Sequence, residues 1–347
     1  MIKAFSIERS HAKNGSSVTV HSGMMDLARS IEQKQGEYER AASLFQDAAE
    51  IFGIAKGNNG AEYADYLREL AGIYSRKGDY SNAEKTYQKA IDVYENVSNA
   101  SSLYLIRCHN ELSLLLIDKG DFQFAEKNIR EVLSVYKDDY KKFLEIPEAI
   151  CILARVLQSM GDNKQAERFY DEALTLFESI VGGAIHQDIA SALNNKSSLM
   201  REMGEYDAAE RYCRSALEMC RKLPGQPNIS YSLIELGIIL IKRSKALAAE
   251  PILREGVEIL KKKLHMDHWQ TAYAECVLGN CLTALKRYEE AEHLLLKNYR
   301  IINSNRGIFH TKTQEVIKYI IELYEAWEKS EKAAECRTFL KDKEVKK

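Results

Sequence analysis

One motif recurs along almost the whole chain: a glycine or its substitute, a short polar turn, and an amphipathic segment that carries an alanine. The aligned turn positions are Gly36, Gly78, Gly120, Gly161, Gly204, Ser244, Lys286 and Glu328. They are separated by steps of 42, 42, 41, 43, 40, 42 and 42 residues. Self-similarity at a fixed period of this size is typical of a repeat array, in which one supersecondary unit is stacked many times. The period constrains the fold more than any other feature of the sequence.

Each repeat contains two segments with helical periodicity. Before the turn, large apolar residues flank a small one, as in Leu236, Gly237 and Leu240. After the turn, the fifth residue is always alanine, from Ala41 to Ala333. Small residues on both helices allow an antiparallel pair to approach closely, and one pair alone cannot bury both of its faces. We therefore expect an all-α fold, an α-solenoid of about eight stacked helix-turn-helix hairpins that form a right-handed superhelix.

The repeats divide the chain into an array and two short tails. Residues 1–19 are polar and lack periodicity, which predicts a loose N-terminal tail. The array spans 20–342, and 343–347 form a charged C-terminal tail. Only 4 prolines occur in 347 residues, as expected for a chain that is helical almost throughout, because an interior proline breaks a helix.

Composition excludes several classes of protein. A net charge of −2 argues against a nucleic-acid or membrane surface as the main partner, and no apolar run is long enough to span a bilayer. The first twenty residues lack the apolar core of a secretory signal. The 7 cysteines form no CxxC pair and read as small buried hydrophobes in a reducing compartment. These features predict a cytoplasmic protein without membrane insertion.

Two fragments of the fifth repeat identify a family resemblance. Leu193-Asn194-Asn195 precedes the turn, and the turn itself reads Gly204-Glu205-Tyr206 with Ala209-Glu210 after it. The pattern resembles the tetratricopeptide repeat of the kinesin-light-chain type, which pairs L-N-N-L-A with G-x-Y-x-x-A-E. The resemblance covers about residues 20–342. It implies a protein-interaction module in which the first helix of each hairpin lines a groove.

Two further features bear on this resemblance. A histidine recurs in the connections between repeats, at His186, His268 and His310. Its identical register in separate repeats favours a structural role over a metal site. The sequence also departs from the family pattern, because Lys196 stands where leucine is expected, and Arg337 and Lys341 stand at positions that are apolar in other repeats. The last two suggest a solvated C-terminal cap.

The resemblance also points to candidate peptide-binding residues. Groove positions in this family lie thirteen, ten, six and three residues before each turn. The residues that we select from them are Arg68, Arg107, Asn110, Arg155, Ser191, Asn194, Ser198, Arg201, Tyr231, Ile234, Ile238, Tyr273 and Asn280. Asparagine can both donate hydrogen bonds to a peptide backbone and accept them from it, and the planar guanidinium of arginine can donate two hydrogen bonds to a carboxylate. Apolar residues on a nominally exposed face should be covered, by a peptide or by another part of the chain. These residues predict a groove for a segment that carries acidic and hydrophobic side chains.

No motif for catalysis, phosphate binding or metal binding occurs in the sequence. We therefore expect no cofactor, no metal and no enzymatic activity. The primary hypothesis is an adaptor or assembly scaffold that binds a protein or peptide partner in its groove. A peptide-responsive regulatory sensor and an enzyme built on an α-solenoid are the alternatives. The sequence leaves the oligomeric state and the identity of the partner open.

Overall fold

The computed structural model describes residues 38–56, 60–96, 102–136, 143–225, 228–264, 267–308 and 310–341. Both expected tails and the first turn at Gly36 lie outside these ranges. The described residues form fifteen α-helices and no strand. The chain divides into two compact units, Met1–Met160 and Gly161–Lys347, which are treated separately below.

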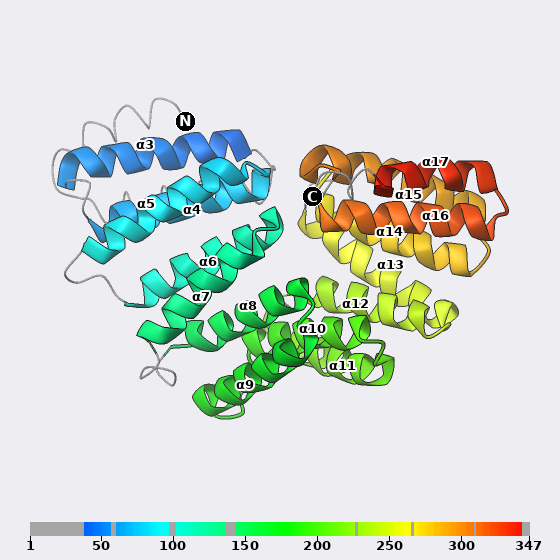
Figure 1. Ribbon diagram of the computed structural model, residues 1–347, viewed down its shortest axis with the longest axis horizontal. Helices are drawn as coiled ribbons and strands as arrows, with labels where there is room; N and C mark the ends of the chain where they lie inside the picture. Colours follow the sequence, from blue (N-terminus) through cyan, green and yellow to red (C-terminus); the bar gives the residue numbers. More distant parts are fainter. Residues whose placement is uncertain are drawn as a thin grey trace. The chain divides into compact units, whose positions relative to one another are not determined.

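Each unit is a stack of antiparallel helices joined by short connections (Figure 1). The first unit contains α3 (Tyr38–Lys56), α4 (Ala61–Lys77), α5 (Tyr80–Asn96), α6 (Ser102–Lys119), α7 (Phe122–Val135) and α8 (Glu145–Met160). The second contains α9 (Asn163–Val181), α10 (Gln187–Glu202), α11 (Tyr206–Lys222), α12 (Ile229–Lys242), α13 (Ala246–Lys263), α14 (Trp269–Ala284), α15 (Tyr288–Arg306), α16 (Thr311–Ala326) and α17 (Ser330–Lys341). Helices α4, α6 and α8 lie beside one another in the first unit, as do α10, α12, α14 and α16 in the second. The all-α solenoid expected from the period is confirmed.

The turn inside each hairpin places one residue in the left-handed region of backbone space. Gly204 has φ 84°, and Lys286, which occupies the same position in a later repeat, has φ 63°. The amide of the next residue, Glu205, donates to the carbonyl of Met200 at 2.8 Å, and Gly204 donates to that of Arg201 at 3.1 Å. These two bonds satisfy carbonyls that the end of a helix would otherwise leave unpaired. The glycine at this position is therefore explained by backbone geometry.

Close approach of the two helices in a hairpin depends on small residues. The alanine five residues after the turn is at most 1% exposed in every repeat, from Ala41 to Ala333. Gly237 on α12 faces Leu253 on α13, and a Cβ atom added to Gly237 would lie 2.2 Å from Leu253 Cδ2. Even alanine would clash there unless the buried side chain of Leu253 shifted. The small residues thus fix the distance between paired helices.

The recurring histidines cap the first helices of three hairpins. His186 Nδ1 accepts the amide hydrogen of Asp188 at 3.3 Å. His268 and His310 accept those of the residues two positions later, each at 3.2 Å. A side-chain acceptor at this position satisfies one of the unpaired amides at the start of a helix. Helix capping explains why histidine returns in the same register.

Two departures from the repeat pattern have distinct structural outcomes. Lys196 is only 3% exposed, although it replaces an apolar residue. Its ammonium pairs with Asp171 and lies 4.6 Å from the ring centroid of Tyr212, so its charge reaches partners on both flanking helices. Arg337 on α17 is exposed and pairs with Glu325.

All seven cysteines carry free thiols, and six of them are buried. Cys336 is half-buried. Burial is the main cause that raises the pKa of Cys281 to about 11, so its thiol stays protonated. The expectation of small buried hydrophobes is confirmed for the six.

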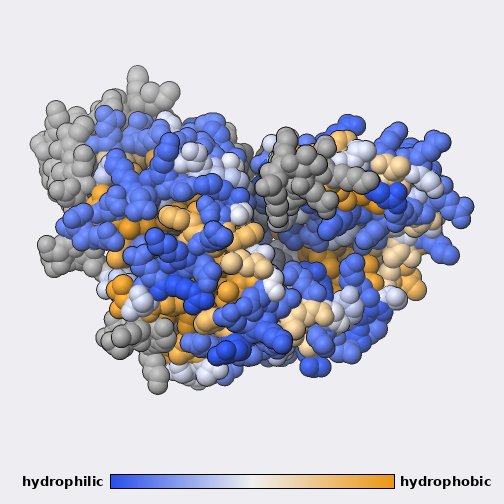
Figure 2. Space-filling view, in the orientation of Figure 1, coloured by the Kyte–Doolittle hydropathy of each residue, from blue (hydrophilic) through white to orange (hydrophobic). Residues whose placement is uncertain are grey.

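The face drawn in Figure 2 carries many hydrophilic residues, with apolar residues between them. Leu247 is 80% exposed and Val135 is 66% exposed, in separate units. In the described part of the chain, no helix has the length and apolar character needed to cross a membrane.

The left-handed turn positions make a paired prediction. Replacing Lys286 by glycine should raise the free energy of unfolding by about 0.5–1 kcal/mol, because a Cβ atom causes steric strain in the left-handed region and glycine has none. Replacing Gly204 by alanine should lower the free energy of unfolding by about 1 kcal/mol for the same reason. Urea unfolding followed by circular dichroism measures both. Changes of the same sign in the two variants would contradict this account of the turn.

The cap at His310 predicts a pH-dependent stability. Burial, with Arg306 and Lys312 nearby, lowers the pKa of His310 from 6.5 to about 4. Between these values the unfolded chain binds a proton that the folded chain does not. The stability contributed by His310 is therefore complete above pH 6.5 and is lost as the pH falls towards 4.

Asparagine at position 310 keeps a capping acceptor but does not titrate in this range. The melting temperature of the His310→Asn variant should therefore fall less than that of the wild type over this pH interval. An equal fall in both would show that His310 does not contribute.

Candidate functional site

The candidate surfaces are formed by the first helices of the hairpins. We call the surface of the selected positions on α4, α6 and α8 the N-terminal face, and that on α10, α12, α14 and α16 the C-terminal face. The N-terminal face carries Arg68, Arg107, Asn110 and Arg155. The C-terminal face carries Ser191, Asn194, Ser198, Arg201, Tyr231, Ile234, Ile238, Tyr273 and Asn280.

Two arginines of the N-terminal face connect neighbouring first helices. Arg68 Nη1 on α4 donates to Glu111 Oε1 on α6 at 2.6 Å. Arg107 Nη2 on α6 donates to Glu145 Oε1 on α8, also at 2.6 Å. The side chain of Arg68 is 11% exposed and that of Arg107 is 40% exposed. Both arginines therefore stabilise the stacking of repeats, and only Arg107 is substantially open to solvent.

Asn110 and Asn194 occupy the same register position in α6 and α10 and are each 1% exposed. Asn110 Nδ2 donates to the carbonyl of Glu145 at 3.0 Å. Asn194 Nδ2 donates to Ser232 Oγ on α12 at 2.8 Å. The Oδ1 atom of each amide is buried and accepts no hydrogen bond from a described residue. The Nδ2 group of each amide thus donates a hydrogen bond to the next repeat, while its Oδ1 atom accepts none from a described residue.

Arg155 differs from the other arginines of the N-terminal face. It lies half-buried on α8. Its guanidinium makes no ion pair or hydrogen bond with any residue in the described ranges. An unpaired guanidinium retains its full capacity to bind a carboxylate.

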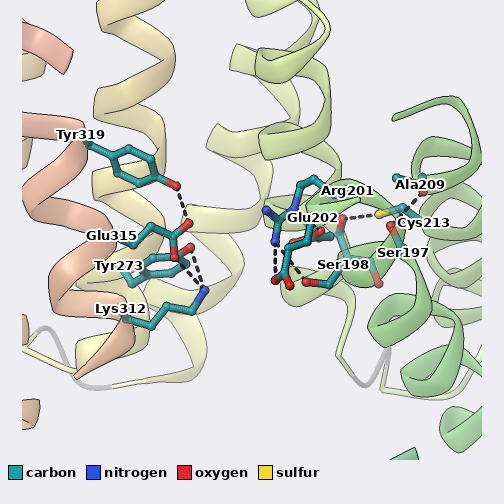
Figure 3. Close-up of polar contacts among 12 residues, drawn as sticks. Ser197, Ser198, Arg201, Glu202, Ala209, Cys213, Tyr273, Lys312, Glu315 and Tyr319 are labelled. Carbon is teal, nitrogen blue, oxygen red and sulfur yellow. Dashed lines mark hydrogen bonds and ion pairs between the residues drawn. The ribbon is translucent and has the colours of Figure 1, made fainter. Parts of the chain in front are cut away.

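The first part of the C-terminal face is built around Arg201 on α10 (Figure 3). Arg201 Nε donates to Glu235 Oε1 on α12 at 2.7 Å, and its Nη2 donates to Ser198 Oγ at 3.0 Å. Glu235 is only 5% exposed. Burial disfavours the charge of Arg201, but the carboxylates of Glu235, Glu315 and Glu202 outweigh it and raise the pKa of Arg201. Arg201 is thus a charged group held by several acids.

The second part is a cluster of Tyr273 on α14 with Lys312, Glu315 and Tyr319 on α16 (Figure 3). Lys312 Nζ donates to Tyr273 Oη and to Glu315 Oε2, each at 3.0 Å, and lies 4.3 Å from the ring centroid of Tyr273. Tyr319 Oη donates to Glu315 Oε1 at 2.7 Å. Burial alone would raise the pKa of Glu315, but Lys312 and the tyrosine hydroxyls lower it to about 2. The cluster is a complete binding site for an ammonium group, and Lys312 fills it.

Of the four residues in this cluster, only Tyr273 was among the positions selected from the sequence. Glu315 lies thirteen residues before the last turn, so extending the same register to that repeat would have found it. Lys312 and Tyr319 fall outside the four selected positions, and no pattern in the sequence marks them.

Of the two alternatives expected for Ile234 and Ile238, cover by a peptide or by another part of the chain, the structure shows the second. The two residues are 6% and 5% exposed, and every residue of α12 from Ser232 to Leu240 is buried. A Cβ atom added to Gly256 on α13 would lie 3.0 Å from Ile234 Cδ1, which shows that Ile234 packs inside its own hairpin. These residues are covered by the chain itself, so their apolar character does not indicate a ligand.

Other selected positions of the C-terminal face also differ in accessibility. Tyr273 is 8% exposed and Asn280 is 9% exposed. Asn280 Nδ2 donates to Glu322 Oε2 on α16 at 2.7 Å. Ser191 Oγ accepts a hydrogen bond from Asn228 Nδ2 at 3.0 Å. Tyr231 is 49% exposed and is the most open large side chain on this face.

The described residues contain no group of three or more histidine, cysteine or acidic side chains that could hold a metal ion. What the two faces offer chemically is a set of hydrogen-bond acceptors, paired charges and one exposed aromatic ring.

The chain is similar in sequence or in fold to several known proteins. The chain is 24% identical over 157 residues to a clustered mitochondria protein homologue of Aspergillus niger. This match covers 44% of the chain and spans 12% of the length of that relative. Among known structures, the Rap conjugation gene regulator of a plasmid, in complex with a peptide, matches with a TM-score of 0.64 and 16% identity, covering 97% of this chain and 91% of that one.

A second structural match is BtubC from P. vanneervenii, with a TM-score of 0.53 and 20% identity over 65% of this chain and 92% of that one. Both structural likenesses concern the fold. The sequence models that match are described as tetratricopeptide repeats, and they cover residues 24–96, 62–138 and 188–262 in one case and 149–188 in the other. These matches extend over more than half of the chain, which therefore belongs to the tetratricopeptide repeat family.

Proposed function

We propose that the chain is a non-enzymatic protein-interaction scaffold that binds a peptide segment of a partner along the first helices of its repeats. The observation that carries the proposal is the ring of Tyr231, a large aromatic side chain that is 49% exposed on the C-terminal face. Family membership supports the coarser part of the proposal, namely interaction with other proteins.

A peptide backbone suits the chemistry of the C-terminal face. It offers N–H and C=O groups at regular intervals, which can pair with a side chain that both donates and accepts, such as the half-buried hydroxyl of Ser198. The ring of Tyr231, 49% exposed, offers an apolar contact beside it. Tyrosine is favoured at interfaces because it buries a large area while its hydroxyl stays hydrogen-bonded. A structural relative of the same fold is described as being in complex with a peptide, which supports peptide binding.

The N-terminal face offers a separate contact through Arg155. Its unpaired guanidinium suits a carboxylate of the partner. We place the protein in the cytoplasm, where a reducing environment maintains thiols such as its seven free cysteines.

A peptide-responsive regulator is a second candidate. One structural relative, which covers 97% of this chain, is described as a gene regulator in complex with a peptide. In a regulator, peptide binding changes the affinity for a second partner, whereas in a scaffold the two bind independently. Titration of the second partner with and without saturating peptide distinguishes them, because only a regulator gives two different dissociation constants.

Peptide binding is tested by selecting ligands from a displayed library of random peptides with the full chain as bait. The affinities of the selected peptides are then measured for variants with alanine at position 198 or 231. Each substitution should weaken binding by about tenfold, which corresponds to about 1.4 kcal/mol and is typical of a central interface residue.

The matched control is Arg211→Ala on the exposed side of α11, which should leave the affinity unchanged. Circular dichroism confirms that all three variants remain folded. Failure to select any peptide, or equal affinity for all variants, would contradict peptide binding at this face.

A further inference from the structure

A glutamate follows the buried alanine, at the sixth position after the turn, in six of the eight repeats. All six side chains lie half-buried on the second helices of their hairpins. A carboxylate that has lost part of its hydration is stabilised by a cation or a hydrogen-bond donor beside it. The residues in question are Glu84, Glu126, Glu167, Glu210, Glu250 and Glu292.

In four of these cases the following repeat supplies the cation. Lys119 Nζ donates to Glu84 Oε2 at 2.7 Å, and Arg243 pairs with Glu210. Both cations stand directly before a turn. The corresponding pairs in the next two repeats, at 2.8 and 3.0 Å, are Glu250–Arg287 and Glu292–Lys332. The acid of one repeat and the cation of the next thus form a recurring contact at the turn edge of the stack.

Glu167 on α9 lacks this contact. No described residue donates a hydrogen bond to its carboxylate or forms an ion pair with it. The position before the next turn, which holds the cation in two other repeats, is Met203, and the other two cation positions are Glu205 and Ala208. Helix α9 packs against α10, whose C-terminal end carries Met203, so the repeat register places Met203 beside Glu167. Met203 is 38% exposed.

The helix of Glu167 supplies no cation either. In three other repeats an arginine four residues later on the same helix pairs with the glutamate. The residue at that position after Glu167 is Asp171, a second acid, which pairs with Lys196. Lys164, about one turn before Glu167, is exposed and makes no ion pair with it. Glu167 is therefore a half-buried carboxylate without the cation that each of its five counterparts has.

A basic side chain suits this position better than a metal ion. One carboxylate is too few ligands for a divalent cation, and the described residues contain no group of three or more histidine, cysteine or acidic side chains that could hold one. Lysine and arginine combine a charged head, which Glu167 can bind, with an aliphatic stem that packs on apolar surface. Met203 offers that surface, and its flexible thioether adapts to the shape of a partner.

We propose that Glu167 and Met203 form a second docking surface, which takes a lysine or arginine side chain of a partner protein. The incoming cation occupies the place beside Glu167 that Arg243 occupies beside Glu210. The surface lies at the turn edge, on a second helix and the end of a first helix. It is separate from the first-helix faces of the proposed function and does not depend on that function.

The test uses a displayed library of peptides with one fixed lysine and random flanking residues, with the full chain as bait. Peptides that also bind the Met203→Arg variant are removed, because this arginine should pair with Glu167 as Arg243 pairs with Glu210. The affinity of the remaining peptides should fall about threefold to fivefold in Glu167→Gln, the upper range for an exposed ion pair. The matched control Glu172→Gln, at an exposed position of the same helix, should leave the affinity unchanged.

A double-mutant cycle isolates the ion pair itself. Replacing the fixed lysine by norleucine should weaken binding to the wild type by the same factor, and it should have no further effect on binding to Glu167→Gln. Glu167→Lys should bind the peptide in which glutamate replaces the fixed lysine, because the charges of the pair are then exchanged. Circular dichroism checks that each variant is folded.

Three outcomes would overturn the inference. No peptide passes the removal step, or the effects of norleucine and Glu167→Gln are independent of each other. The selected peptides lose affinity in Tyr231→Ala, which would assign them to the first-helix face and leave the proposed function intact. Finally, sedimentation velocity shows that the wild type self-associates and that Glu167→Gln does not, which would make a second copy of the chain the occupant.

Discussion

The structure depends on the close approach of the two helices within each hairpin. Alanine at the fifth position after the turn is buried in all eight repeats. At Gly237 the side chain of Leu253 on the paired helix packs so closely that one added carbon would lie 2.2 Å from it. At such separations many dispersion contacts form between the two helices, each weak but together large. A hairpin that is packed in this way has a defined outer surface, and that surface is what the next repeat recognises.

Stacking of repeats then uses many of the polar groups that a ligand would otherwise meet. Arg68, Arg107, Asn194 and Arg201 each bond to the first helix of the next repeat. Buried polar side chains are usually hydrogen-bonded, so these bonds help to specify the register of the stack. What stays accessible for binding includes the ring of Tyr231, which is 49% exposed, and the half-buried guanidinium of Arg155.

The fold could be predicted from the sequence because repetition strengthens signals that are weak in a single copy. One Gly-x-Tyr or one buried alanine means little, but their return at a constant step identifies the turn and the packed side of each hairpin. The same step placed Lys286 and Glu328 at turns even though neither is glycine, and both have positive φ.

Orientation about the helix axis was predicted less well than position along the chain. The residue ten positions before the turn was expected to face the groove, but Ile234 and Asn194 point towards neighbouring helices and are buried. Successive residues differ by about 100° around a helix, so a small rotation decides whether a position faces solvent or the next repeat. In α12, where consecutive residues from Ser232 to Leu240 are all buried, no polar stripe exists in the sequence to reveal that rotation.

The most direct test of the account is a site-specific crosslink. A photoreactive benzoylphenylalanine replaces Tyr231 on the C-terminal face or Arg211 on the exposed side of α11, and each protein is irradiated with a peptide selected by the wild type. The account predicts a covalent adduct with the peptide at position 231 and none at position 211. An adduct at 211 alone, or equal adducts at both positions, would contradict binding along the first helices.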